Sequence, residues 1–351
     1  MGKNSQFGTL PSKDYIERFS VSKQFDVAKK VFVNRRPEIL KEMRKRAMSI
    51  PTFIEFFRPR KDRFPAKPLP VVKPDLKKFL EPSDAIKVIW FGHSTFLLNL
   101  EGKIILVDPV FSKSASPIRF MMKRFQAPAL SLSELPPIDL ILLSHDHYDH
   151  LDMESVKFFA NKNVPFLCPL GVSSHLIGWG INEEMITELD WWQEKNIVDL
   201  NFIATPAQHF SGRDGLHDNA TLWCSWVIQS SKHNIYFSGD SGYDTHFKDI
   251  GEKYGPFDIA FMETGQYNEL WREVHMLPEE AAEAFFDLKA KKYFPIHWGM
   301  FRLSIHTWYE PVEKIHQYSL EKNIPLVTPK LGEIVELNEH FQNQLWWKEL
   351  I

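Results

Sequence analysis

The sequence lacks the features that are typical of secreted, membrane-spanning or lipid-anchored proteins. It has two cysteines in 351 residues, Cys168 and Cys224, each in an apolar context, so a disulfide framework is not expected. No apolar run approaches the roughly 18 residues of a membrane-spanning helix, and the first residues lack the apolar segment of a secretory signal. Gln6 stands where the N-myristoylation pattern needs serine or threonine. These absences predict a cytoplasmic protein with reduced thiols.

Charge is nearly balanced over the whole chain, with a formal net charge of −3, but it is unevenly distributed. Residues 1–80 hold 20 lysines and arginines against 8 acidic residues, so the remainder is strongly acidic. Residues 49–70 interleave phenylalanine, arginine, lysine and proline, a composition suited to anionic lipid headgroups. The alternative is an extension that packs over the acidic body. No nucleic-acid-binding motif accompanies the basic residues, so a nucleic-acid partner is not expected.

Beyond residue 85 the sequence consists of short apolar runs bounded by glycine, proline, asparagine or aspartate. This pattern predicts strands within 85–92, 96–109, 138–146, 164–171, 201–209, 221–229, 234–242 and 258–265. Helical patterns occupy 153–163 and 278–292, where Pro278 and two glutamates suit a helix start. Many strands with few helices between them favour two packed sheets with helices on their outer faces.

The segment LLSHDHYDHLD, residues 142–152, places three histidines and two aspartates in the six positions from His145 to His150. Imidazole and carboxylate groups are costly to bury together unless a cation holds them. The segment leaves the end of a buried apolar strand, where side chains can converge without filling the core. Nitrogen and oxygen donors together suit Zn²⁺, with Mn²⁺ or Fe²⁺ also possible.

Three further segments end a predicted strand on a potential ligand, namely His209, Asp240 and His297. A single histidine is usually structural, but the HxHxDH cluster together with these strand-end residues supplies seven donors. Seven donors are enough for two metal ions. The sequence therefore predicts a metal site with room for two ions.

Four segments in this order, SHDHYDH, TPAQHFSGR, FSGDSGY and PIHWGMF, resemble the signature segments of the metallo-β-lactamase fold. They are most similar to the phospholipase D group that hydrolyses N-acylphosphatidylethanolamine, and runs such as LPVVKP, WFGHST and VDPVFS extend the similarity. The resemblance implies an α+β fold, an αββα sandwich of two packed sheets flanked by helices, with a dinuclear site at one edge. The hydrolase domain would span residues 81–338, between a basic extension over 1–80 and a tail over 339–351.

The resemblance also implies a role for each ligand. The first metal ion would be held by His145, His147 and His209, the second by Asp149, His150 and His297, and Asp240 would bridge them. Two divalent ions, Zn²⁺ first among them, would then generate a bridging hydroxide at neutral pH, which Asp149 would orient. His275 aligns with a family histidine and would protonate the leaving group or contact a phosphate oxygen. A helix-start histidine with no catalytic part is the alternative for His275.

Other residues near the motifs are expected to support the site. His93, Asp108, Ser241 and Tyr243 are expected to hold ligands by hydrogen bonds rather than to bind metal directly. Arg213 is expected to pair either with a phosphate or in a surface salt bridge. The histidines without a motif around them are expected to be structural: His175, His217, His233, His306, His316 and His340. The loop 112–131 either shapes substrate access or is a surface connection with Phe120, Met121 and Met122 buried beneath it.

The function that the resemblance implies is that of a metal-dependent phosphodiesterase of the phospholipase D type. It would hydrolyse N-acylphosphatidylethanolamine-like lipids to an N-acylethanolamine and a phosphatidic acid. Peripheral membrane association is expected only if the basic extension contacts lipid rather than packing on the body. A lactonase or another small-phosphoester hydrolase of the same fold is the alternative. A non-catalytic metal-binding or lipid-sensing protein is an alternative of another class. The sequence leaves the acyl chain, the metal and the oligomeric state open.

Overall fold

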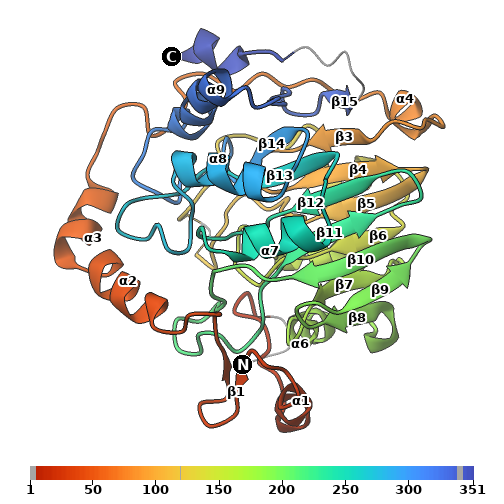
Figure 1. The fold of residues 1–351 in the computed structure, drawn as a ribbon, viewed down its shortest axis with the longest axis vertical. Helices are drawn as coiled ribbons and strands as arrows, with labels where there is room; N and C mark the ends of the chain where they lie inside the picture. The colour runs from red at the N-terminus through yellow and green to blue at the C-terminus, as the bar shows by residue number, and fades with distance from the viewer. Residues whose placement is uncertain (1–4, 119, 338–342) are drawn as a thin grey trace.

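Two β-sheets pack face to face in the computed structural model, which describes residues 5–118, 120–337 and 343–351 (Figure 1). One sheet has seven strands in the order β15-β3-β4-β5-β6-β7-β8. Their bounds are Lys87–Trp90 for β3, Phe96–Leu100 for β4, Lys103–Val107 for β5, Leu140–Leu142 for β6, Phe166–Pro169 for β7, Ile186–Leu189 for β8 and Ile334–Glu336 for β15.

The other sheet has six strands in the order β14-β13-β12-β11-β10-β9. Their bounds are Glu194–Ile197 for β9, Leu200–Thr205 for β10, Ser225–Gln229 for β11, Asn234–Phe237 for β12, Ile259–Glu263 for β13 and Tyr293–Ile296 for β14. Strands β12, β13 and β14 are parallel, and β10 points the same way because β11 is antiparallel to both β10 and β12. The carboxyl ends of these four strands therefore lie at one edge of the sheet.

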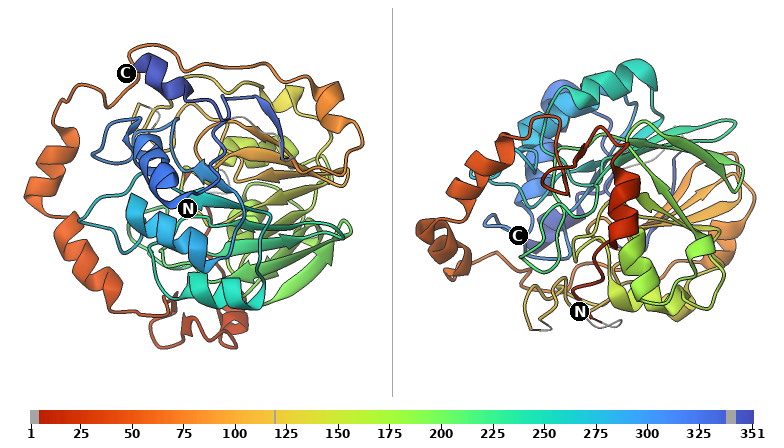
Figure 2. Two further views of the ribbon diagram at one scale, coloured as in Figure 1. Left: turned by 45° about the horizontal axis from the view of Figure 1, so that its top comes forward. Right: turned by 90° about the horizontal axis from the view of Figure 1, so that it is seen from below.

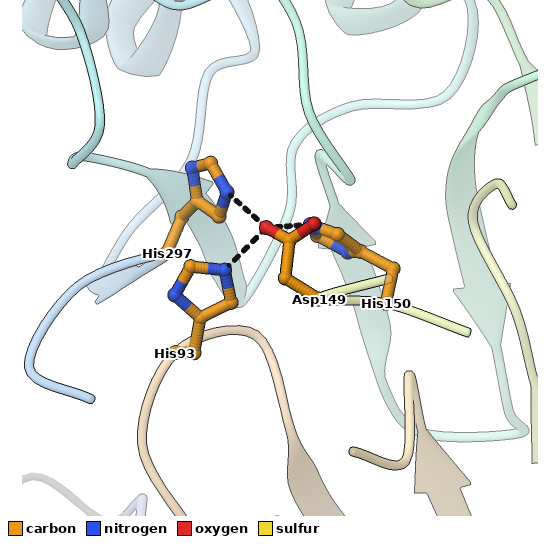
Figure 3. A group of neighbouring side chains, drawn as sticks. All are labelled: His93, Asp149, His150 and His297. Carbon is orange, nitrogen blue, oxygen red and sulfur yellow. Dashed lines mark hydrogen bonds and ion pairs between the residues drawn. The ribbon is translucent and has the colours of Figure 1, made fainter. Parts of the chain in front are cut away.

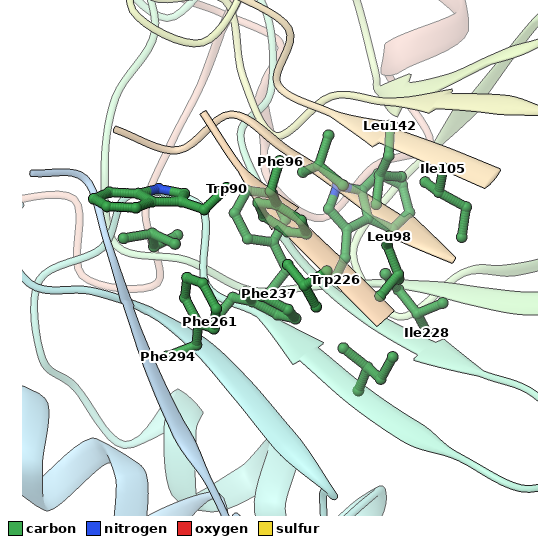
Figure 4. Close-up of a cluster of buried hydrophobic side chains, with 14 of the residues drawn as sticks. Trp90, Phe96, Leu98, Ile105, Leu142, Trp226, Ile228, Phe237, Phe261 and Phe294 are labelled. Atoms are coloured by element: carbon green, nitrogen blue, oxygen red, sulfur yellow. The ribbon is translucent and has the colours of Figure 1, made fainter. Parts of the chain in front are cut away.

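Three hydrophobic clusters account for the layers. The cluster between the sheets includes Trp90, Phe96, Trp226 and Phe261, and the rings of Phe96 and Phe261 stack with centroids 4.3 Å apart (Figure 4). A second cluster packs the seven-stranded sheet against α5 (Met153–Phe159) and α6 (Ser173–Gly178). A third packs the six-stranded sheet against α7 (His246–Lys253), α8 (Pro278–Asp287) and α9 (Glu310–Lys322). The right-hand view of Figure 2 shows helices on both sides of the sheets, so the expected αββα sandwich is confirmed.

The central strands read as continuous apolar runs because both of their faces are covered. In β4, Phe96 and Leu98 face the inter-sheet cluster, whereas Leu97 faces the helices on the other side. All eight predicted strand segments contain a strand, and the two predicted helices are present as the shorter α5 and α8. The sequence did not predict β9, whose residues EKNI are largely exposed at a sheet edge and carry no apolar signal.

The basic extension does not form a unit apart from the body. It contains α1 (Lys13–Phe19), β1 (Phe25–Asp26), β2 (Val31–Phe32), α2 (Ile39–Ala47), α3 (Ile50–Phe57) and α4 (Leu76–Leu80). Phe19, Phe25 and Phe32 contact one another and belong to the inter-sheet cluster. Helices α2 and α3 form an arm along one side of the molecule (Figure 1). The first part of the extension therefore packs on the body, whereas α3 leaves its apolar residues Phe53 and Ile54 exposed.

At the other end of the chain, Trp346 and Trp347 are buried, and Trp346 stacks on Trp298 with centroids 5.4 Å apart. Residues 339–342 of the predicted tail, His340 among them, lie outside the described residues. Cys168 and Cys224 are both buried and free, as expected. Within the described residues, no helix is both long and apolar enough to cross a membrane. The division of the chain at residues 80 and 338 stays a prediction.

Candidate metal centre

The structure brings all seven predicted ligands to the edge where the parallel strands end. His145, His147, Asp149 and His150 lie in the loop after β6, His209 in the loop after β10, Asp240 after β12 and His297 directly after β14. Six of the seven side chains are buried and His147 is half-buried. The ligands converge because these strands run toward the same edge, each followed by a loop that turns across it.

One group of potential ligands consists of His145, His147, His209 and Asp240. The Nδ1 atom of His147 lies 3.0 Å from Nε2 of His145 and 3.1 Å from Nε2 of His209. Asp240 Oδ2 lies 3.7 Å from Nε2 of His145 and 3.7 Å from Nε2 of His209. Zn–N bonds of about 2.0–2.1 Å in a tetrahedral site place neighbouring nitrogens roughly 3.3 Å apart. The three ring nitrogens are therefore spaced as ligands of one cation.

A second group contains His93, Asp149, His150 and His297 (Figure 3). Asp149 Oδ2 lies 2.7 Å from His93 Nε2, 3.2 Å from His297 Nε2 and 3.5 Å from His150 Nε2. The carboxylate of Asp240 also reaches this group, with Oδ1 3.1 Å from His150 Nε2 and Oδ2 3.2 Å from His297 Nε2. Asp240 thus contacts both groups, which is the position expected for a bridging residue.

The charges of these groups are consistent with bound cations. Burial opposes ionisation of Asp149 and Asp240, yet the surrounding histidines hold the pKa of both carboxyls well below its ordinary range. Burial also opposes protonation of His297, but Asp240, Asp149 and Glu263 raise its pKa to about 10. Two buried atoms, His150 Nε2 and Asp240 Oδ1, lie 3.1 Å apart but form no well-directed hydrogen bond with each other or with another described residue, and a buried polar atom left unpaired costs about 1–3 kcal/mol. Imidazole nitrogens and carboxylate oxygens that converge in this way form a donor set that fits divalent transition-metal ions.

Asp108 and His93 contact the ligands directly. Asp108 accepts hydrogen bonds from the Ser144 N–H at 2.8 Å and the Ser144 hydroxyl at 2.6 Å, and its Oδ2 lies 2.7 Å from His150 Nδ1. This contact turns the Nε2 atom of His150 toward the other ligands, which is the supporting role expected of Asp108. His93 is close enough to Asp149 either to orient it or to complete the second group.

Glu263 is a site residue that the sequence analysis missed. It ends β13, is fully buried, and contacts Nδ1 of His275 and, at 3.1 Å, Nδ1 of His297. It also accepts a hydrogen bond from the Ser241 N–H at 2.6 Å, which places Ser241 in a supporting position as expected. With Nδ1 of His275 held by Glu263, Nε2 is the nitrogen left for a substrate. An acid at the end of an apolar strand, the signal that selected Asp240, would also have selected Glu263.

A pocket of about 460 Å³ opens above the ligands. His147, Asp149, Asp240, His275 and His297 contribute to its lining. Its apolar walls come from Met43, Ala47, Phe210, Trp271, Val274 and Leu303. Met43 and Ala47 belong to α2, which packs against Phe210, Trp271 and Val274. The basic extension therefore forms one side of the pocket.

Three expectations for the surroundings of the site are wrong. Arg213 is buried and donates to the carbonyls of Asp146 at 2.5 Å and Leu151 at 2.8 Å, so it braces the loop after β6 and is free neither for a phosphate nor for a surface ion pair. The Tyr243 hydroxyl donates to Asp287 at the surface, away from the ligands. Phe120 is 75% exposed and is not buried beneath its loop.

The structure also places the loop 112–131 and two of the histidines that were expected to be structural, His175 and His217. Phe120, Met121 and Met122 line a second groove together with Phe56, Phe57, Phe64 and Arg302. His175 is buried behind the loop after β6, with Nε2 3.2 Å from Asp146 Oδ2. His217 lies beside Asp214 at the surface. His175 thus supports the metal loop, whereas His217 is structural.

Two packed sheets with histidine and aspartate clusters at their carboxyl edge define a metal-dependent hydrolase of the metallo-β-lactamase fold. Residues 103–298 match the beta-lactamase superfamily domain, and the chain belongs to this family.

Known proteins agree with this assignment. An uncharacterised protein of Mycobacterium tuberculosis is 39% identical over 289 residues, which cover 81% of this chain and 77% of that protein. The N-acyl-phosphatidylethanolamine-hydrolyzing phospholipase D 1 of Caenorhabditis elegans is 37% identical over 269 residues, 71% of this chain and 75% of that protein. The metallo hydrolase Igni18 of Ignicoccus hospitalis has a TM-score of 0.56 at 20% identity, over 72% of this chain and 97% of Igni18, and supports the fold. The resemblance to the phospholipase D group is confirmed.

Proposed function

We propose that the protein is a dinuclear metal-dependent phosphodiesterase that hydrolyses N-acylphosphatidylethanolamine-like lipids to an N-acylethanolamine and a phosphatidic acid. The observation that carries the proposal is the pair of ligand groups, both contacted by Asp240, at the base of an apolar-walled pocket. The similarity to a relative named for this activity supports the choice of substrate.

The seven ligands divide between two ions in this proposal. The first ion would be held by His145, His147 and His209, the second by Asp149, His150 and His297, and Asp240 would contribute to both. When bound, the ions would make a water molecule acidic enough to attack at neutral pH and would neutralise charge on the phosphate. Zn²⁺ suits this donor set, and Mn²⁺ or Fe²⁺ would also fit.

The chain's own residues position the water and the leaving group. Asp149 lines the pocket, and its carboxylate accepts a hydrogen bond from the attacking water. Attack at phosphorus breaks the bond to the oxygen of the N-acylethanolamine. His275 lines the same pocket and donates the proton that this oxygen takes, while Glu263 holds the opposite nitrogen of its ring. The apolar walls accommodate a lipid chain beside the phosphate.

The exposed face of α3 supports a lipid substrate. We define the α3 apolar face as Met48, Ile50, Phe53, Ile54 and Phe57, whose side chains are all at least half exposed. A large exposed apolar surface of this kind usually marks an interaction site. It adjoins α2, which forms the pocket wall, and basic residues lie close to it in the sequence: Lys41, Lys45, Arg58, Arg60 and Lys61. Lys45 pairs with Glu42, and Arg58 and Arg60 pair with Glu55. Exposed apolar side chains with basic residues nearby complement an anionic bilayer, so the α3 apolar face is proposed to hold the pocket at a membrane surface.

A substrate panel tests the proposal. Purified protein of measured metal content would be offered N-acylphosphatidylethanolamine, a bis-aryl phosphodiester and a simple lactone in parallel, with Asp240→Asn as the control for contaminating activity. Both phosphodiesters should be hydrolysed, the lipid to phosphatidic acid and N-acylethanolamine, and the lactone should survive. Hydrolysis of the lactone alone would favour a lactonase, and metal binding without any turnover would favour a binding protein.

A further inference from the structure

Asn34 of the basic extension is bonded to a proposed ligand that is remote in sequence. The Asn34 side chain is 3% exposed, its Nδ2 donates to the His209 carbonyl at 2.7 Å, and its Oδ1 accepts from the His209 N–H at 3.1 Å. His209 lies in the loop after β10, outside any strand of the described chain. One amide therefore satisfies both backbone hydrogen-bonding groups of His209, as a neighbouring strand would do.

The backbone around Asn34 is itself fixed to the body. The Phe32 N–H donates to the Asn219 carbonyl at 2.8 Å, and the Val33 N–H donates to the Gln24 carbonyl at 2.7 Å. Phe32 pairs with Phe25 across the β1–β2 ladder, and both rings are buried in the inter-sheet cluster. The backbone next to Asn34 is therefore fixed in position relative to the loop that carries His209.

A second part of the extension, residues 5–9, reaches the loop after β6. The Thr9 N–H donates to His175 Nδ1 at 3.0 Å, so this nitrogen carries no proton in the neutral ring. The proton is then on Nε2, which donates to Asp146 Oδ2 at 3.2 Å. Asp146 stands between His145 and His147 in the sequence. Thr9 thus fixes the tautomer of the histidine that anchors the loop of two proposed ligands.

Residues 5–9 also contact Arg213, which donates to backbone carbonyls of the loop after β6. The carbonyl of Gln6 accepts from the guanidinium of Arg213, at 3.0 Å from Nη2, and Arg213 donates to the Asp146 carbonyl. The Ser5 carbonyl accepts from the indole of Trp179 at 3.0 Å, just after the end of α6.

We propose that the extension is a positioning part of the first metal site, in which Asn34 holds His209 and residues 5–9 hold the loop of His145 and His147. The inference rests on the ligand assignment proposed above. Asn34 contacts His209 directly, whereas residues 5–9 reach His145 and His147 only through His175 and Arg213, which both bond to Asp146 between them. Within the described parts of the chain, no hydrogen bond joins the extension to the side chains that hold the second ion. The extension lies outside the matched family domain, residues 103–298, so the first site is completed from outside that domain.

Asn34→Ala tests the first contact, with Asn99→Ala as a matched control. Asn99 is 5% exposed, its Nδ2 donates to the Phe79 carbonyl at 2.7 Å, and its Oδ1 accepts from the Gly102 N–H at 3.1 Å, at the β4–β5 turn. Both substitutions therefore remove one bond to a carbonyl and one from an N–H, but only Asn34 contacts a ligand. Competition with a chelator would measure the affinity of each ion in both variants and in the wild-type chain.

Groups that hydrogen-bond the side chain of a metal ligand typically contribute about 10–100-fold to metal affinity, and because Asn34 holds the backbone of His209 rather than its ring, a loss of about tenfold is expected. Asn34→Ala should weaken one ion per chain by this factor and leave the other unchanged, whereas Asn99→Ala should hold both ions like the wild-type chain. With Co²⁺ in place of the native metal, the visible absorption of the weakened site should change in Asn34→Ala and not in Asn99→Ala. Deletion of residues 1–10, which removes the Thr9 contact and keeps the β1–β2 hairpin, should weaken the same ion.

Several results would overturn the inference. Wild-type affinity in both Asn34→Ala and the deletion variant would show that the extension does not position the site. An equal loss in Asn34→Ala and Asn99→Ala, or an equal loss of both ions, would trace the effect to general destabilisation. A wild-type chain that binds no metal at all would overturn the proposed function together with this inference, whereas metal binding that both Asn34→Ala and the deletion variant leave intact would overturn the inference alone.

Discussion

Substitution of Phe53 by serine on the α3 apolar face should weaken binding to anionic vesicles. Complete burial of a phenylalanine side chain contributes about 1.5–3 kcal/mol. Because Phe53 is 66% exposed, insertion into a bilayer has about two-thirds of this value to gain, or about 1–2 kcal/mol. Since 1.4 kcal/mol corresponds to tenfold, the partition coefficient should fall roughly 5–30-fold. Sedimentation with vesicles that contain anionic lipid measures this change.

Leu320→Ser is the matched control because Leu320, on α9, is 69% exposed but lies outside the α2–α3 arm. It should leave vesicle binding unchanged. Turnover of a water-soluble phosphodiester should be the same in both variants, because neither residue lines the pocket. Vesicle binding that is equal in Phe53→Ser and the wild-type chain would refute the membrane role of α3. Removal of residues 1–60 would be a poorer test, because Phe32 and Asn34 in that stretch are buried against the body.

Three further predictions follow from the contacts of single residues. His275→Ala should leave metal content unchanged and lower turnover of the lipid about 10²–10⁴-fold, with a smaller defect on an activated aryl phosphodiester; equal defects on both substrates would exclude His275 as the general acid. Asp108→Asn should lower metal affinity about 10–100-fold, because the carboxylate orients His150, and unchanged chelator competition would contradict this role. Phe32→Ala should lower the free energy of unfolding by about 3–5 kcal/mol, because the ring is fully buried; denaturant titration would show a loss below about 1 kcal/mol if the hairpin were dispensable.

The central strands could be predicted because they are covered on both faces and therefore carry uninterrupted apolar runs. The same reasoning fails for β9, whose edge position permits polar residues. It also fails for the extension, where Phe19, Phe25 and Phe32 are too far apart to form a periodic pattern but meet in one cluster. Composition alone left open whether the extension packs or binds lipid, and the structure assigns packing to residues 5–35 and exposure to α3.

The convergence of the seven proposed ligands could be predicted because histidine and aspartate at the ends of apolar strands have few other reasons to be there. Arg213 could not, because FSGR has the composition of a surface loop, whereas its guanidinium is buried under three backbone carbonyls. Asn34 and Glu263 act through contacts with residues distant in sequence. A spacing rule finds residues that share a strand end, but not a partner brought in by another part of the chain.

The metal content of the purified and reconstituted chain is the most direct test of the account. Elemental analysis should give close to two transition-metal ions per chain for the wild-type protein, because six of the seven proposed ligands divide between two groups and Asp240 contacts both. Asp240→Asn removes a charge that both ions require, and it should lower the occupancy and abolish turnover together. A stoichiometry that never exceeds one ion per wild-type chain after reconstitution would contradict the dinuclear site.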